Sequence, residues 1–143
     1  MKSPDGRECS TFLRHKKIAL AGRRTATLYL LNPLLRRAER VEVDNCVIAE
    51  GPRYDWLVRL DDATSREEIY VELKGSDILH AVDQLEATIS KLSMDCRRFP
   101  KRCLVACSRS PLTGTDVQKY KDRFHDRFGA SFQVVRDGAE VPL

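Results

Sequence analysis

The sequence lacks long apolar runs and a strong excess of charge of one sign, and each absence excludes a class of protein. No apolar run approaches the roughly 20 residues of a membrane-spanning helix. The N-terminal segment MKSPDGRECS also has no apolar stretch that could serve as a signal peptide. The net charge of +4, from 25 Lys and Arg against 21 Asp and Glu, permits a polyanionic partner without requiring one. We therefore predict a cytoplasmic protein that does not associate with membranes.

A dense cysteine framework is also absent. The chain has five cysteines, an odd number, which favours the reduced thiols of a cytosolic protein. Cys103 and Cys107 have the wrong spacing for a zinc knuckle or a redox CxxC pair, and they lie in an apolar run that is typical of a buried strand. We expect both to pack in the core. A cysteine-dependent redox protein is a weaker alternative, which unaltered behaviour of Cys103→Ser and Cys107→Ser variants would exclude.

The length and the hydrophobic content predict one folded domain. The 143 residues, 42% of them hydrophobic, suffice for a real core and contain no repeat, linker or low-complexity tract. We expect a single domain over residues 1–143, with residues 1–24 partly irregular. Runs of β-forming residues predict strands, and apolar side chains spaced three and four residues apart predict helices. The expected strands are 25–31, 40–48, 54–60, 68–74, 103–107 and 131–136, and the expected helices are 76–93 and 115–128.

From Arg40 onward, the predicted order is β-β-β-α-β followed by a further α-β. Three strands joined by short turns and then connected through helices predict an α/β domain with a mixed central sheet flanked by helices. Gly129 is expected to end the second helix, because glycine tolerates the left-handed conformation that follows a helix.

Chemistry-bearing residues gather on two of these strands. Side chains alternate between the faces of a strand, so Glu72 and Lys74 project side by side. If the strands 54–60 and 68–74 pair as a hairpin, Asp55 lies near Glu72. Two adjacent carboxylates repel each other unless a cation lies between them, and hard oxygen ligands suit Mg²⁺ or Mn²⁺. Lys74 could then orient an attacking water or stabilise charge on a phosphate.

This pattern resembles the PD-(D/E)XK superfamily of nucleases, which includes restriction endonucleases and Holliday-junction resolvases. The resemblance rests on RYD at 53–55, ELK at 72–74 and Gln84 on the following helix, and it covers about residues 41–107. It implies a restriction-endonuclease-like fold with Asp55 and Glu72 as metal ligands. It also implies catalytic roles for Lys74 and Gln84. Pro52 departs from the family pattern, because it lies two residues too early.

Further residues are expected around this site. The family often supplies another glutamate from an N-terminal helix, and no such helix is evident before Arg40. Candidates for accessory roles are Asp44, Glu50 and His80. Basic side chains can bind the phosphates of a nucleic acid independently of its base sequence. The expected nucleic-acid contacts are Arg97, Arg98, Lys101, Lys119, Arg123 and Arg127.

The function predicted from these residues is Mg²⁺-dependent endonucleolytic hydrolysis of DNA phosphodiester bonds. Many nucleases of this type dimerise to cut both strands, so a homodimer is among the expected assemblies. The alternative is a catalytically silent nuclease-fold module that binds nucleic acid or a protein partner. The intact set of Asp55, Glu72 and Lys74 favours the enzyme, since a silent member is expected to lose at least one of them.

Overall fold

Strands dominate the part of the chain that the structure describes, and only two helices occur there. The computed structural model describes residues 1–22, 27–44, 46–48, 55–61, 66–73, 78–93, 100–107 and 114–143. The strands are β1 (Ser10–Leu13), β2 (Lys17–Ala21), β3 (Thr27–Leu31), β4 (Ala38–Glu42), β5 (Trp56–Asp61), β6 (Arg66–Leu73), β7 (Lys101–Cys107), β8 (Ala130–Arg136) and β9 (Glu140–Pro142). The helices are α1 (Ile78–Leu92) and α2 (Gly114–Phe128). The order β-β-β-α-β-α-β from β4 to β8 is the predicted one.

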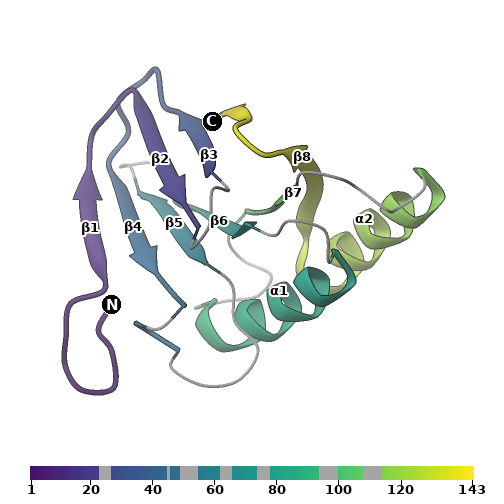
Figure 1. Cartoon of the computed structure of the whole chain (residues 1–143), viewed down its shortest axis with the longest axis horizontal. Helices are drawn as coiled ribbons and strands as arrows, with labels where there is room; N and C mark the ends of the chain where they lie inside the picture. The colour runs from purple at the N-terminus through teal and green to yellow at the C-terminus, as the bar shows by residue number, and fades with distance from the viewer. Residues whose placement is uncertain are drawn as a thin grey trace.

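A mixed six-stranded sheet forms the centre of the molecule, with strand order β1-β4-β5-β6-β7-β8 (Figure 1). The first four strands in this order pair antiparallel, and β7 and β8 continue the sheet parallel to β6. α1 and α2 provide the two crossover connections between these parallel strands. The first crossover leads from β6 to its neighbour β7, and the second leads in the same direction from β7 to β8. Because such connections are right-handed, both helices lie on the same face of the sheet.

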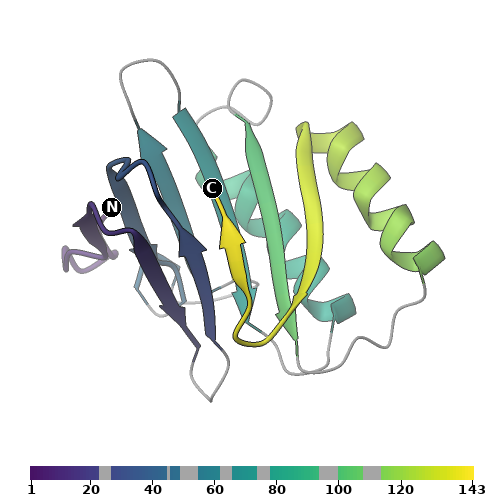
Figure 2. The ribbon, with the colours of Figure 1, turned by 90° about the horizontal axis from the view of Figure 1, so that it is seen from above.

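The helices cover one face of the central sheet, and a second sheet covers the other (Figure 2). Under the helices, Leu57 and Tyr70 pack with Leu85 and Phe124. On the opposite face, the strands β2, β3 and β9 form a three-stranded mixed sheet. Its alternating buried side chains, such as Leu20, pack against the strands β5 to β7. The prediction of helices as the cover of the sheet is thus correct for one face and wrong for the other.

The N-terminal segment is more regular than the sequence indicated. Residues 1–24 were expected to be partly irregular, but β1 adds an edge strand to the large sheet and β2 pairs with β3. In β2, Ile18 and Leu20 are buried between exposed neighbours, which is the period of a strand that covers a core. Neither helix in the described part of the chain is long and apolar enough to span a bilayer.

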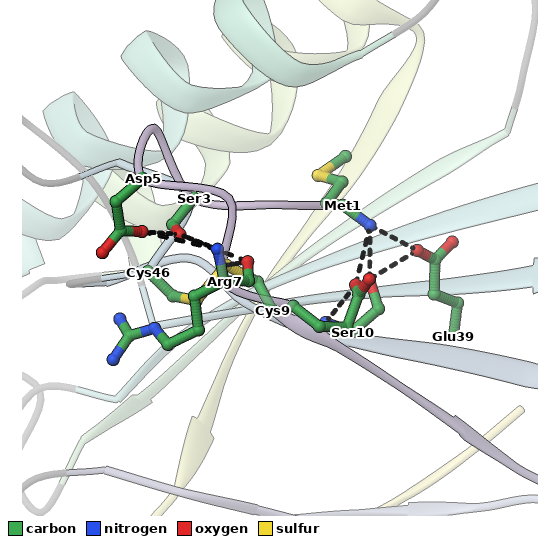
Figure 3. Close-up of a disulfide and its surroundings, with 9 residues drawn as sticks. Met1, Ser3, Asp5, Arg7, Cys9, Ser10, Glu39 and Cys46 are labelled. Atoms are coloured by element: carbon green, nitrogen blue, oxygen red, sulfur yellow. Dashed lines mark hydrogen bonds and ion pairs between the residues drawn. A yellow bond between two sulfur atoms is a disulfide. The ribbon is translucent and has the colours of Figure 1, made fainter.

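The strand predicted over residues 40–48 ends earlier than expected, at Glu42. A turn follows, in which the amides of Cys46 and Ile48 both donate to the carbonyl oxygen of Val43. This turn carries a disulfide between Cys46 and Cys9, whose Cα atoms lie 5.7 Å apart (Figure 3). The prediction of reduced thiols throughout is therefore wrong for this pair. β1 and β4 are neighbours in the sheet, and their pairing brings two cysteines 37 residues apart in sequence into contact.

The prediction that Cys103 and Cys107 pack in the core is confirmed. Both are free thiols with almost no exposed surface. Burial raises the pKa of each thiol above its ordinary value, so the reactive thiolate is scarce at neutral pH. We expect iodoacetamide at pH 8 to leave both residues unmodified in the folded protein and to label both after denaturation. Peptide mass spectrometry measures this, and labelling of either residue in the native state would contradict its placement.

Candidate functional site

The hairpin of β5 and β6 brings Asp55 and Glu72 together. Trp56 pairs with Val71 in this hairpin, so continuing the register by one residue places Asp55 opposite Glu72. The amide of Leu73 donates a hydrogen bond of 2.6 Å to the Asp55 carboxylate oxygen Oδ2. A carboxylate that accepts a backbone amide has a fixed orientation. The predicted proximity of the two acidic residues is therefore a feature of the fold.

Glu72 lies on the face of the sheet that the helices cover. Its side chain alternates with Val71 and Leu73, which pack toward the second sheet. Glu72 is 1% exposed, whereas Asp55 is partly exposed. A carboxylate that is withdrawn from water is stable only near cations or hydrogen-bond donors. The site thus combines one buried and one accessible carboxylate at the end of the hairpin.

Gln84 lies on α1, which packs over β6 and β7. Its side chain is partly buried, and its oxygen Oε1 is buried without a hydrogen-bond partner among the described residues. Thr88, one turn further along, is fully buried and donates its hydroxyl to the Gln84 carbonyl oxygen. Both polar side chains on this side of α1 are therefore at least partly withdrawn from solvent.

Several predicted site residues lie outside the described residues. Lys74 and Glu50 are among them, and the side chain of His80 is not described although its backbone belongs to α1. Asp44 lies in the turn after β4, where it forms an isolated bridge with Ile48. This position favours a role for Asp44 in the turn, where aspartate is a common residue, over the accessory site role.

The donor set at this end of the hairpin fits a magnesium-type ion. Among the described residues, no group of three or more His, Cys, Asp or Glu side chains is positioned to hold a metal. Mg²⁺ commonly uses only one or two carboxylates, with waters and substrate oxygens as its remaining ligands. Asp55 and Glu72 match that mode. The orphaned acceptor of Gln84, on the covering helix, is suited to accept a hydrogen bond from a water.

A second set of charged residues crosses the same face of the sheet further from the hairpin end. Glu39 pairs with Arg59, Arg59 with Glu68, and Glu68 with Lys101, so the charge alternates from strand to strand. Glu68 and Lys101 are buried, with 3.8 Å between Glu68 Oε1 and Lys101 Nζ. Ser93 donates a hydrogen bond of 2.8 Å to the same carboxylate oxygen. We refer to these four charged residues as the charge row.

Tyr70 lies between the charge row and Glu72 on β6. It is fully buried, and its burial, followed by the nearby Glu68 carboxylate, raises the pKa of the Tyr70 hydroxyl above its ordinary value. The hydroxyl therefore stays protonated under physiological conditions. Nothing in the sequence pattern had indicated the charge row, because its members are distributed over four strands and meet only through the pairing register.

The structure contradicts one of the predicted nucleic-acid contacts, Lys101, and gives two others, Arg123 and Arg127, an acidic partner within the protein while their side chains stay about half exposed. The Lys101 side chain has no exposed surface and pairs with Glu68, so it cannot reach a phosphate in solvent. Arg123 and Arg127 on α2 both bind the Glu86 carboxylate on α1, Arg123 through Nε and Arg127 through Nη1, each at 2.5 Å. These arginines therefore join the two helices. Lys119 is exposed, and Arg97 and Arg98 lie outside the described residues.

A broad, open cleft of about 770 Å³ lies at the other end of the parallel strands. The first residues of β7 and β8 form its floor, and Lys121 and His125 of α2 form one side. Glu72 pairs with Val105, near the opposite end of β7. The cleft is therefore separate from the carboxylate pair, and no metal-binding role is assigned to it.

Comparisons with models of known protein families, with curated protein sequences and with solved structures found no match.

Proposed function

We propose that the protein is a metal-dependent nuclease of the PD-(D/E)XK type, with a restriction-endonuclease-like fold, that hydrolyses phosphodiester bonds in DNA. The observation that carries this proposal is the hydrogen bond from the Leu73 amide to the Asp55 carboxylate, at the end of the β5–β6 hairpin where Glu72 immediately precedes Leu73. Lys74 follows Leu73 directly in the sequence, so the ELK motif at 72–74 begins on β6 next to the Asp55 contact. The strand and helix order from β4 to β7 also agrees with this proposal.

Each residue has a chemical role in this proposal. Asp55 and Glu72 would hold Mg²⁺ or Mn²⁺, and the bound ion would polarise the phosphodiester and acidify a water. The backbone amide of Leu73 keeps the Asp55 carboxylate directed into the site. The Lys74 ammonium would stabilise the charge that develops on the phosphate, and Gln84 would orient the water through its side-chain amide. The partner is a nucleic acid, which Lys119 and other exposed basic residues would hold by its phosphates.

The direct test is cleavage of plasmid and single-stranded DNA in the presence of Mg²⁺ or Mn²⁺. We expect the wild-type protein to cut at least one of these substrates and to lose activity with a chelator. The Lys74→Ala variant should be slower by roughly 100-fold, the usual effect of removing one group that stabilises transition-state charge. Lys91→Ala is the matched control, because Lys91 is an exposed lysine in the last turn of α1.

Two results would contradict the proposal. If the wild-type protein cuts no DNA or RNA with any divalent ion, the catalytically silent binding module becomes the better interpretation. If Lys74→Ala and Lys91→Ala are equally active, the cleavage does not depend on the proposed site and comes from another source.

A further inference from the structure

We infer that the Cys9–Cys46 disulfide is a redox-sensitive device that positions Asp55, and that its reduction loosens the carboxylate pair. The inference concerns regulation of the site and rests on the proposed function only where it refers to metal binding. Both cysteines are buried, at 7% and 3% exposure. Their bond joins the N-terminal segment to the turn that precedes β5 (Figure 3).

A series of backbone hydrogen bonds links this disulfide to the proposed site. The Cys46 amide donates to the carbonyl oxygen of Val43, at 3.4 Å. The Val43 amide in turn donates to the backbone carbonyl oxygen of Asp55, at 3.1 Å. The Asp55 carboxylate then accepts the Leu73 amide. The position of Asp55 is therefore fixed from two sides, by β6 and by the turn that the disulfide holds.

The other end of the disulfide belongs to the edge of the molecule. Cys9 precedes β1, an edge strand of four residues, and its carbonyl oxygen accepts the Glu42 amide at 3.0 Å. The preceding residues form a loop that projects from this edge (Figure 1). An isolated bridge between Lys2 and Glu8 holds it locally, and the Met1 amino group pairs with Glu39 on β4 at 3.4 Å. Terminal edge segments open more easily than central strands, so a reductant can reach the sulfur atoms without unfolding of the core.

The redox step needs a dithiol reductant. One of its thiolates attacks a sulfur of the disulfide, and the other resolves the mixed disulfide. Two electrons and two protons pass to Cys9 and Cys46, and the reductant becomes a cyclic disulfide. Cys103 and Cys107 are free thiols, so this bond is not part of a disulfide framework in the described residues. In a reducing compartment such an isolated disulfide is characteristically transient and redox-responsive.

Amide hydrogen exchange of the metal-free protein tests the inference without any activity measurement. Dithiothreitol is the reductant, and peptide mapping with alkylation first verifies the Cys9–Cys46 bond in the oxidised protein. On reduction, we expect exchange at the Val43 and Leu73 amides to accelerate roughly tenfold or more, as for local opening. Amides of the central strand β7, such as Val105, should keep their protection. The Cys9→Ser/Cys46→Ser variant should exchange like the reduced protein and should not respond to dithiothreitol.

Three results would overturn the inference. Peptide mapping could find no Cys9–Cys46 bond after mild oxidation. Val43 and Leu73 could keep their protection after complete reduction. All amides, including those of β7, could accelerate together, which would make the disulfide an ordinary structural crosslink.

Mn²⁺ titration then tests the connection to the proposed metal site. We expect reduction to weaken Mn²⁺ binding by roughly 10-fold, the lower end of the effect of losing an interaction that orients a metal ligand. Equal affinity in both redox states would overturn this connection. Absence of Mn²⁺ binding in both states would contradict the proposed function, whereas the exchange result would still report on the positioning of Asp55.

Discussion

Replacing Glu72 with glutamine is expected to lower the rate of metal-dependent DNA cleavage by roughly 1000-fold, which corresponds to about 4 kcal/mol of lost transition-state stabilisation. Glutamine has nearly the same volume as glutamate, so it can occupy the buried position of Glu72 while removing the negative charge. A neutral amide oxygen is a much weaker ligand for Mg²⁺ than a carboxylate. Single-turnover cleavage at saturating Mn²⁺ measures the rate, and calorimetric titration measures the accompanying loss of metal affinity.

The control for this variant is Glu140→Gln. Glu140 lies on β9 in the second sheet, where it is exposed and forms a surface ion pair with Lys17. Its replacement removes the same charge from the protein without touching the hairpin end. Cleavage by Glu72→Gln at the rate of the wild-type protein would show that the buried carboxylate is not a metal ligand. An equal loss in both variants would indicate a general charge effect.

The largest expected effect on stability comes from the charge row. Lys101→Met is expected to lower the free energy of unfolding by about 3–5 kcal/mol, the usual cost of removing one partner from a buried ion pair. Methionine fills a similar volume, so the loss reflects the charge of Lys101 and not a cavity. Arg59 and Ser93 still contact Glu68 in the variant, which keeps the effect within this range. The melting temperature should fall by roughly 10 °C for a chain of this size.

An exposed pair and a double variant provide the controls for this prediction. Lys17→Met breaks the Lys17–Glu140 pair, whose side chains are about half exposed, and should cost at most about 1 kcal/mol. Lys101→Met/Glu68→Gln should be less destabilised than the sum of the two single variants, because the remaining charge is removed with its partner. Urea denaturation measures the free energy of unfolding of the wild-type protein, of the single variants Lys17→Met, Lys101→Met and Glu68→Gln, and of the double variant. Equal effects of Lys101→Met and Lys17→Met would contradict the assigned role of the charge row.

The elements from β4 to β8 could be predicted from the sequence because their local patterns agree with the global fold. The apolar stripe of α1, with Val82, Leu85 and Ile89, has helical spacing, and all three side chains are buried. Gly129 follows α2 with a φ of 63° and donates its amide to the His125 carbonyl oxygen, as a helix-ending glycine does. Of the N-terminal strands that were missed, β1 is a short edge strand whose side chains are all at least partly exposed, so it carries no buried-exposed alternation.

The candidate site was predictable from the sequence only where it depends on the pattern within single strands, and not where it depends on which strands pair. Alternation along each strand was enough to place Asp55 and Glu72 on one face, and the short connection between the strands indicated a hairpin. The charge row and the Cys9–Cys46 disulfide depend on which strands are neighbours and in what register, and β1 had not been recognised. The burial of Lys101 has the same origin, whereas the pairing of Arg123 with Glu86 depends on where α1 and α2 lie relative to each other. A list of basic residues does not distinguish those facing solvent from those facing an acidic partner.

The most direct test of the account is a crystal structure of the wild-type protein soaked in Mn²⁺, with anomalous diffraction recorded at the manganese edge. We predict one strong anomalous peak at coordination distance from the carboxylates of both Asp55 and Glu72, with Lys74 directed toward it. An anomalous map without a peak between these carboxylates, at a manganese concentration that supports DNA cleavage, would contradict the metal site on which the proposed function depends.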